Sequence, residues 1–399
     1  MRILFLSEVL PHARVVSGAV NVNRRICLLA ARGHEVGLAA FIRPSEVEFI
    51  PELRPALYEM ELLPAPPERQ WLRRAIVFGL RGVPGPFAEV RDRAMQQLVG
   101  RMIDRSHYDV VVAEFTGMGQ YLHRNPYLPP VRRVISVHTC LTTALRRTIQ
   151  LNPWSWASLR ARLRLAAIER YEFAVYRSAD QLLALSGEER VDLQRYAPDL
   201  RVSVVPYGVD TDHFRPRPDV PPEECLVYTG YFRQFDNRDA VFWFLREVWP
   251  RLRERWPALK FYIVGQAPPP EFYDAVRRDE RIVVTGGVPD VADYLARARV
   301  YICPMRMGSG FRGKILQAMA AGVPVVATTM AAAGIPAQSG ANMMLADTPD
   351  TMVRAINLLL EDAYLRQGIA DRARDVTVER FAWPHCVDLL ERVLTGLVT

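Results

Sequence analysis

The chain has 399 residues, a length that suggests two domains of ordinary size. Half of the chain is hydrophobic and 24% is charged, which excludes the disordered and fibrous classes. The formal net charge is +7 and comes almost wholly from arginine, since Lys260 and Lys314 are the two lysines. Such a charge suits nucleic acid, anionic lipid or phosphorylated small molecules as partners, and a general bias towards arginine explains it equally well.

Five scattered cysteines are present, Cys27, Cys140, Cys225, Cys303 and Cys386. They are odd in number and lack metal-ligand spacing, so we expect no metal site and a reducing, cytoplasmic compartment. The apolar run at the N-terminus is too short for a signal peptide, and Glu8 interrupts it. No stretch approaches the roughly 20 apolar residues of a membrane span.

The first half alternates short apolar runs with longer helical patterns. A loop with Ser17 and Gly18 precedes an amphipathic helix predicted over residues 20–32, which Gly33 closes. The predicted strands are residues 2–6, 35–41, 109–113, 133–137, 181–185 and 202–205. Continuous apolar strands separated by helices predict a parallel sheet covered on both faces.

A proline-rich segment, residues 206–222, is interpreted as an interdomain linker, after which the same alternation restarts. The later strands are predicted at residues 225–229, 259–264, 282–285, 300–303, 324–327 and 343–345. We therefore expect an α/β protein with two doubly wound parallel-sheet domains, residues 1–205 and 206–382, facing a central cleft. A last helix, residues 383–399, is expected to pack back on the first domain.

Two stretches are both basic and apolar, residues 70–81 and residues 144–164 with Trp154 and Trp156. Arginine with tryptophan and leucine suits a membrane interface, so peripheral contact with the anionic inner face of a membrane is one interpretation. The alternative is a solvated helix whose apolar side belongs to the core.

The most informative stretch begins at Pro304, where a predicted strand ends. A loop with Gly308, Ser309 and Gly310 follows, and a helix is predicted to begin near Arg312. A glycine loop lets the backbone approach a ligand, and a helix start offers free N–H groups to phosphate. Arg312 and Lys314 add two positive charges there, so the pattern predicts a diphosphate site. A structural loop with two solvated basic side chains is the alternative.

This stretch resembles the donor-binding region of glycosyltransferase family 4. The resemblance extends over nearly the whole chain and includes residues 109–122, 204–214, 228–244, 261–265 and 285–291. It implies the GT-B fold, in which two Rossmann-like domains bind the acceptor on the N-terminal side and the donor on the C-terminal side.

The family implies retaining transfer of a hexose-type sugar from a UDP- or GDP-linked donor to a hydroxyl of a glycan, a lipid-linked glycan or a small natural product. No metal and no cofactor are expected, and polysaccharide biosynthesis is a natural setting. The departing phosphate takes the proton of the acceptor on the same face, so catalysis depends on stabilising charge on the diphosphate. Arg312 and Lys314 fit that role as catalytic residues.

Several further residues receive roles from the resemblance. His138, at a strand end, is predicted to act beside these cations by contacting the donor sugar or phosphate, with a structural role as the alternative. Glu114 is assigned to the acceptor side or to a salt bridge. Arg233 supplies a third cation or is solvated, and Asp290 either faces the base or caps a helix. The predicted donor-binding residues are Gly18, Arg233, Asn237, Val288, Asp290, Gly308, Ser309, Gly310 and Gln317.

The sequence departs from the family pattern around this cleft. Ser309 and Gln317 replace two glutamates, and the second loss removes a charged acceptor for the ribose hydroxyls, at a cost of about 1 kcal/mol. Phe235 and Asp236 replace a histidine–proline pair. Thr139 and Ala333 stand where an aspartate and a glutamate are frequent. These departures indicate an unusual substrate or weakened activity.

Three other functions remain open. A nucleotide-sugar epimerase shares the fold, although the motifs match transferases. A catalytically silent GT-B subunit, which binds nucleotide and supports another transferase, is favoured by the altered cleft residues. Nucleic-acid binding is a weak interpretation of the basic charge, so nucleic acid is not expected as a partner.

Overall fold

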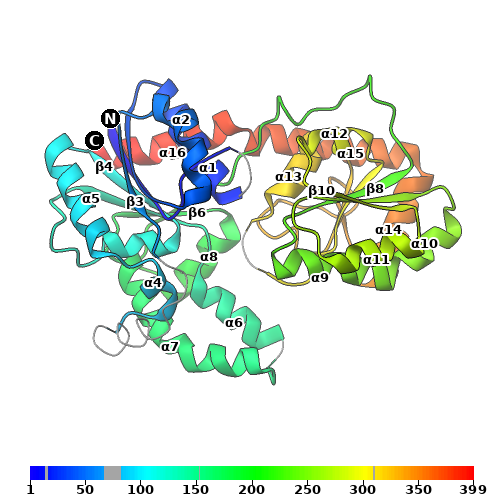
Figure 1. Cartoon of the computed structure of the whole chain (residues 1–399), viewed down its shortest axis with the longest axis horizontal. Helices are drawn as coiled ribbons and strands as arrows, with labels where there is room; N and C mark the ends of the chain where they lie inside the picture. The colour runs from blue at the N-terminus through cyan, green and yellow to red at the C-terminus, as the bar shows by residue number, and fades with distance from the viewer. Residues whose placement is uncertain (14–16, 67–81, 152, 309–310) are drawn as a thin grey trace. The chain divides into compact units, whose positions relative to one another are not determined.

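The computed structural model describes residues 1–13, 17–66, 82–151, 153–308 and 311–399. The chain divides into two compact units (Figure 1). The N-terminal unit comprises Met1–Pro206 together with Cys386–Thr399, and the C-terminal unit comprises Tyr207–His385.

The N-terminal unit contains a seven-stranded parallel sheet in the order β3-β2-β1-β4-β5-β6-β7. The strands are β1 (Arg2–Ser7), β2 (Glu35–Ile42), β3 (Glu59–Pro64), β4 (Val110–Glu114), β5 (Arg132–Val137), β6 (Gln181–Ala184) and β7 (Val202–Val204). Strand β3 was not predicted, because this edge strand is only half-buried and lacks the continuous apolar run of its neighbours.

Helices cover both faces of this sheet. They are α1 (Ser17–Ala31), η1 (Pro44–Phe49), α2 (Ile50–Leu53), η2 (Arg54–Ala56), α4 (Gly85–Glu89), α5 (Arg93–Ser106), η3 (Thr116–Tyr121), α6 (Leu141–Leu151), α7 (Trp156–Tyr176), α8 (Gly187–Tyr196) and α16 (Trp383–Val398). One apolar cluster contains Val22 and Ile26 of α1, and a separate cluster contains Met95 of α5 and Phe173 of α7. The sheet is therefore doubly wound, as predicted.

The last helix, α16, belongs largely to the N-terminal unit. Its residues Leu390 and Leu394 lie in the same apolar cluster as α1. Arg32, just after α1, pairs with Glu391 at 2.6 Å, and His34 lies 2.8 Å from the other oxygen of that carboxylate. Apolar burial and ion pairs thus hold the end of the chain against its first helix.

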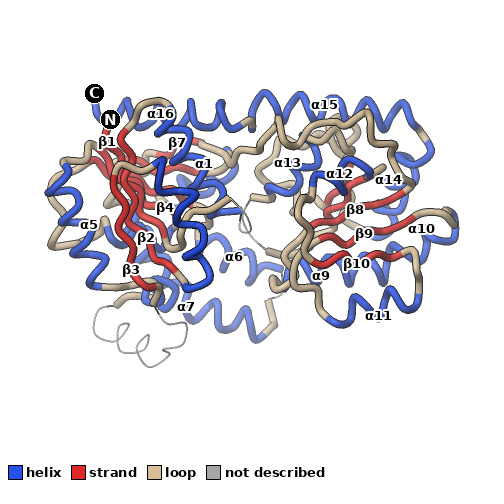
Figure 2. The backbone as a smooth tube through the Cα atoms, turned by 45° about the horizontal axis from the view of Figure 1, so that its top comes forward, coloured by secondary structure: helices blue, strands red, loops and turns tan. Residues whose placement is uncertain are grey.

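The C-terminal unit contains a six-stranded parallel sheet in the order β10-β9-β8-β11-β12-β13 (Figure 2). Its strands are β8 (Cys225–Thr229), β9 (Lys260–Val264), β10 (Ile282–Gly286), β11 (Val300–Cys303), β12 (Val325–Ala327) and β13 (Met344–Leu345). Its helices are α9 (Phe235–Trp243), η4 (Phe244–Val248), α10 (Trp249–Arg255), α11 (Pro270–Arg278), α12 (Ala292–Arg297), α13 (Gly313–Ala320), α14 (Pro349–Glu361) and α15 (Ala363–Phe381).

Both sheets have the strand order of a dinucleotide-binding fold, in which the direction of winding reverses beside the first strand. The reversal lies between β1 and β4 in one unit and between β8 and β11 in the other. Ligands of open parallel sheets bind outside the carboxyl ends of the strands at this point. The loops after β4, β8 and β11 are therefore the places to look for a site.

The first residues of the predicted linker, residues 206–222, form backbone contacts with the end of α15. Val209 forms a parallel bridge with Ala382, and its N–H donates to the carbonyl of Phe381 at 2.7 Å. Within the described residues, no helix combines the length and the apolar character that crossing a bilayer requires.

Candidate nucleotide-sugar site

The predicted diphosphate cations lie in the loop after β11 and in the first turn of the helix that follows it. The loop follows Cys303 and ends where α13 begins at Gly313. Gly308 has φ +102°, a backbone conformation that other residues rarely adopt. A Cβ at Gly308 would lie 2.6 Å from Nη2 of Arg312 and 2.7 Å from Oδ2 of Asp236, so a side chain there would displace the ends of both charged groups.

Lys314, in the first turn of α13, reaches back to the end of β8. Its ammonium donates to the hydroxyl of Tyr228 at 2.9 Å, to the carbonyl of Thr229 at 3.0 Å and to Oδ1 of Asn237 at 2.6 Å. The ammonium also lies 4.3 Å from the centre of the Tyr228 ring. Three acceptors and one aromatic ring thus fix the ammonium at the point where the winding direction of the sheet reverses.

The charge of Lys314 is held in an unfavourable setting. Burial, together with the positive charge of Arg312, lowers the pKa of Lys314 from 10.5 to about 8. The ammonium donates its hydrogen bonds to neutral oxygens, which orient the ammonium without neutralising it. An anion brought to this place would therefore be attracted strongly.

Asn237, predicted to bind the donor, is buried at the start of α9. Its Oδ1 accepts from Lys314 and from the Tyr228 hydroxyl at 2.8 Å, and its amide nitrogen donates to Gln234 at 2.9 Å and to the carbonyl of Tyr231 at 3.1 Å. The structure therefore places Asn237 as a residue that positions Lys314.

Arg312 is the N-cap residue of α13 and its side chain is 9% exposed. Its Nη2 lies 4.0 Å from Oδ2 of Asp236, one of the two residues that replace the family's histidine–proline pair. A carboxylate thus stands beside the cation that is predicted to receive a phosphate.

The other predicted donor residues of the C-terminal unit are distributed over loops and helix α13. Arg233 is exposed after β8, and Val288 is partly buried after β10. Asp290 accepts from the N–H of Ala292 at 2.9 Å and from His213 at 3.1 Å, which fits its alternative role at the start of α12. Gln317 follows Lys314 by one turn on α13. Ser309 and Gly310 lie outside the described residues.

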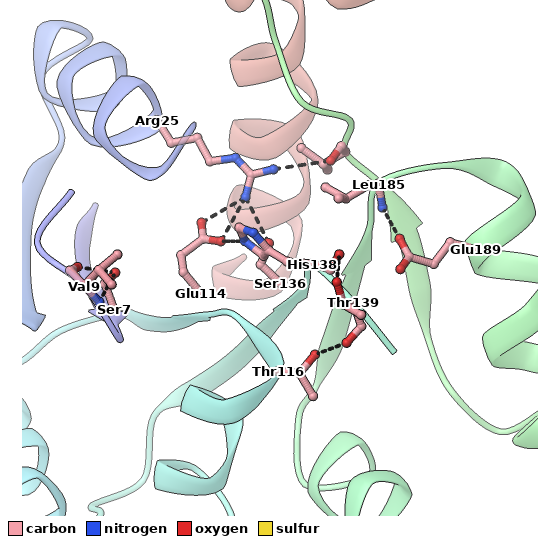
Figure 3. Close-up of polar contacts among 11 residues, drawn as sticks. Ser7, Val9, Arg25, Glu114, Thr116, Ser136, His138, Thr139, Leu185 and Glu189 are labelled. Atoms are coloured by element: carbon pink, nitrogen blue, oxygen red, sulfur yellow. Dashed lines mark hydrogen bonds and ion pairs between the residues drawn. The ribbon is translucent and has the colours of Figure 1, made fainter. Parts of the chain in front are cut away.

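The N-terminal unit contains a buried polar cluster at the end of β4 (Figure 3). Nη1 of Arg25, on α1, donates to Glu114 at 2.9 Å and to the hydroxyl of Ser136 at 3.0 Å. Its Nη2 donates to the carbonyl of Val205 at 3.3 Å. Glu114 is 0% exposed, so the structure places it in the salt bridge that was the alternative to acceptor contact.

His138 completes this cluster. Its Nε2 lies 2.7 Å from Oε2 of Glu114, and a carboxylate can only accept, so Nε2 carries the proton. Burial alone would raise the pKa of Glu114, but the charge of Arg25 and the bond from His138 lower it to about 2. Burial and the Arg25 charge lower the pKa of His138 despite the opposing carboxylate, so the imidazole is neutral near pH 7.

Gly18, in the first turn of α1, lies against the same cluster. A Cβ there would lie 2.7 Å from Cε1 of Phe115 and 3.8 Å from Nδ1 of His138. The Phe115 and His138 rings are in contact, with centroids 4.1 Å apart and planes tilted by 39°, and Phe115 has φ +72°, a strained backbone for a residue with a side chain. The structure thus brings together Gly18, Glu114 and His138, which the sequence analysis assigned separately.

Arg25 and Tyr228 were assigned no role in the sequence analysis. Arg25 is 1% exposed, and its one signal in the sequence is its place between Val22 and Ile26 in an otherwise apolar helix face. Tyr228 is 0% exposed in an apolar strand, where its hydroxyl needs a polar partner. Among the described residues, no group of three or more histidine, cysteine or acidic residues is arranged to hold a metal ion.

Two Rossmann-ordered parallel sheets define the GT-B class, and known structures agree. Sucrose-phosphate synthase from Thermosynechococcus elongatus superposes with a TM-score of 0.73 over 100% of this chain and 99% of the other, at 16% identity. A model of Glycosyltransferase Family 4 matches residues 16–213, and a model of Glycosyl transferases group 1 matches residues 223–362. The chain belongs to glycosyltransferase family 4, one of the group 1 glycosyl transferases.

Two curated relatives have named acceptors. Phosphatidyl-myo-inositol mannosyltransferase from Mycolicibacterium smegmatis is 31% identical over 45% of this chain and 48% of its own length. D-inositol 3-phosphate glycosyltransferase from Geodermatophilus obscurus is 27% identical over 73% of this chain and 67% of its own length. The matched region thus spans about half of the first relative and two thirds of the second.

Proposed function

We propose that the protein transfers a hexose from a UDP- or GDP-linked donor to a hydroxyl acceptor, with retention of the anomeric configuration. The observation that carries the proposal is the presence of two cations, Lys314 and Arg312, at the start of α13. This place lies beside the point where the winding direction of the C-terminal sheet reverses. A second, independent support is that glycosyltransferase models match both units, the family 4 model over residues 16–213 and the group 1 model over residues 223–362.

The two cations suit different parts of the reaction. Lys314 is fixed by Tyr228 and Asn237, so it acts as a pre-oriented point charge that needs no reorganisation as the leaving diphosphate gains charge. Arg312 offers a planar guanidinium that can form two parallel hydrogen bonds to a phosphate. The N–H groups at the start of α13 add a partial positive charge to the same place.

His138 has a narrower role in this proposal. In a neutral imidazole that donates from Nε2 to Glu114, Nδ1 is an acceptor and cannot donate to a phosphate, which favours contact with a sugar hydroxyl. We therefore assign His138 to the sugar, with Glu114 and Arg25 as the residues that orient it. The acceptor hydroxyl then attacks on the face that the diphosphate leaves, and a phosphate oxygen takes its proton.

The test is release of nucleoside diphosphate from a panel of UDP- and GDP-hexoses, with product analysis by NMR for the anomeric configuration. Inositol-bearing acceptors head the acceptor panel, because both curated relatives are named for them. Arg312→Ala and Lys314→Met are each expected to reduce turnover by roughly 100-fold or more.

The matched control is Arg306→Ala. Arg306 comes from the same loop but donates to both oxygens of Asp239, at 2.8 and 2.9 Å, and lies over the Trp243 ring. Its loss should leave turnover within a few-fold of the parent. Equal losses in all three variants, or inversion of configuration in the product, would contradict the proposal.

A second candidate is a nucleotide-binding subunit without turnover, and the Asp236 carboxylate beside Arg312 favours it. In that case nucleoside diphosphates raise the melting temperature, no donor on the panel is consumed, and Gln317→Glu does not restore consumption. Isomerisation of the donor sugar would instead indicate an epimerase.

A further inference from the structure

The tip of the α6–α7 hairpin exposes large apolar side chains. Trp154 is 93% exposed, Trp156 is 78% exposed and Leu163 is 77% exposed. A single exposed apolar residue needs no explanation, but several on neighbouring turns mark an interaction site. The second basic and apolar stretch of the sequence is the one that forms this tip, whereas residues 70–81, the first stretch, lie outside the described residues.

Helix α7 is apolar on two opposite sides. Ala161 and Ile168 are each 3% exposed and face the protein. Trp156, Leu159 and Leu163 recur at spacings of three and four residues, so they form a stripe on the outer side. A helix with one side in the core normally carries polar residues on the other, so this outer stripe is not accounted for by the fold of the unit.

The same surface is strongly basic. Arg160, Arg162 and Arg164 are exposed, and none forms an ion pair with a residue that the structure describes. Glu169 is the one acidic residue between positions 141 and 170, and it accepts from Arg146 at 3.0 and 2.8 Å. The arginines near the tip therefore keep their positive charge uncompensated.

The root of the hairpin is firmly held. Glu172 of α7 accepts from the backbone N–H groups of Leu141 and Thr142, at 2.8 and 2.9 Å, and thereby joins the start of α6 to the end of α7. Phe173 and Tyr176 lie in the core of the N-terminal unit. Figure 1 shows the two helices side by side, so the tip is presented on a rigid base.

We propose that Trp154, Trp156, Leu159, Leu163, Arg160, Arg162 and Arg164, here called the hairpin surface, dock the protein on an anionic lipid bilayer. Tryptophan and leucine enter the boundary between headgroups and acyl chains, and arginines beside them pair with anionic headgroups. The combination argues against a protein partner, because largely exposed tryptophans beside a dense, uncompensated positive charge match a boundary that is both negative and apolar. The proposal does not depend on the sugar donor.

The experiment is flotation of the full chain with vesicles of phosphatidylcholine alone or with 30% phosphatidylglycerol (on the order of the anionic content that such interfaces carry). Binding is expected to the anionic vesicles and to weaken with added salt. Arg160→Gln, Arg162→Gln and Arg164→Gln together should reduce the partition coefficient by roughly 100-fold, at about fivefold per arginine. Trp154→Ser with Trp156→Ser should abolish flotation.

Matched controls come from other surfaces of the chain. Tyr364 is also 93% exposed, so Tyr364→Ser removes an equally exposed aromatic ring. Arg101, Arg278 and Arg354 are exposed and form no ion pair with described residues, so their replacement by glutamine makes the same change in net charge. Both control variants should float like the parent.

Two results would overturn the proposal. One is a parent chain that fails to float with anionic vesicles. The other is an equal loss in the control variants, which would assign binding to the overall charge. If the parent forms dimers by light scattering and the Trp154→Ser Trp156→Ser variant does not, while neither floats, the surface is an interface between two copies. Release of nucleoside diphosphate by the hairpin variants, measured with a soluble acceptor, separates this result from failure of the proposed transfer.

Discussion

The carboxylate of Asp236 lies 4.0 Å from the guanidinium of Arg312, and the backbone of Gly308 lies close to both groups. The backbone N–H of Asn237 donates to the same carboxylate at 3.0 Å, which keeps it at the start of α9. A diphosphate approaching Arg312 would therefore meet a negative charge at the start of α9. The contact between Asp236 and Arg312 thus gives a physical consequence of one departure from the family pattern, the presence of Asp236.

Asp236→Asn should bind nucleoside diphosphates more tightly than the parent. Two unit charges 4 Å apart repel by about 1 kcal/mol even in bulk water, which corresponds to roughly a fivefold gain in affinity on removal of one charge. Titration calorimetry with UDP and GDP measures the change. Asp239→Asn is the control, because Asp239 pairs with Arg306 instead of Arg312. A lower affinity in Asp236→Asn would show that the carboxylate helps to position Arg312 for the ligand.

The affinity for nucleoside diphosphates should fall as the pH rises through 8. Lys314 has a pKa of about 8, so it is charged below that pH and loses its charge above it. Binding of an anion favours the charged form, and the dissociation constant should therefore rise by up to about tenfold for each pH unit above 8. Calorimetry between pH 7 and pH 9.5 tests this, since the ligand phosphates are fully ionised over most of that range.

Lys314→Arg is the companion variant for this titration. An arginine does not titrate in the same range, so any remaining affinity should be independent of pH. A parent protein whose affinity is constant from pH 7 to pH 9.5 would mean that Lys314 does not contribute its charge to binding.

The fold followed from the sequence because buried parallel strands leave a direct signal. Continuous apolar runs located all but one strand of the two sheets, and β3 escaped because it is a half-buried edge strand. The start of α13 was predicted near Arg312, and the structure begins the helix at Gly313. Turn and helix-start residues act locally, so a single sequence suffices to place them.

The arrangement of side chains within the sites did not follow from the sequence. Arg25 and Glu114 are 89 residues apart in the chain, and Lys314 and Tyr228 are 86 apart. Such contacts depend on which strands are neighbours and on the register between them, which local patterns do not specify. Asn237 was assigned to the donor because the motif contains it, whereas its hydrogen bonds to Lys314 and Gln234 are visible only in three dimensions.

Arg25→Met should destabilise the protein by roughly 3–5 kcal/mol, because it leaves the Glu114 carboxylate buried without its cation. Urea unfolding at pH 7 measures the loss. Adding Glu114→Gln to this variant should recover part of it, since a neutral amide costs less to bury. The ion pair lowers the folded-state pKa of Glu114. Its contribution to the free energy of unfolding is therefore complete above the ordinary pKa of 4.5 and is lost as the pH falls towards 2. A parent and variant of equal stability at pH 7 would contradict this account.

Gly18→Ala should disturb the cluster that holds His138. The added methyl would lie 2.7 Å from the Phe115 ring, which is confined by its contact with His138 and by a backbone already at φ +72°. Overpacking of this kind costs roughly 1–3 kcal/mol, and the displaced imidazole should lower turnover more than it lowers affinity for nucleoside diphosphate.

The control is Gly187→Ala at the start of α8, where nothing lies within 4 Å of the new Cβ. Because alanine favours helices in both places, a loss in Gly18→Ala with none in Gly187→Ala assigns the effect to Phe115 and His138. Equal stability and equal turnover in the two variants would remove the cluster from the proposed mechanism.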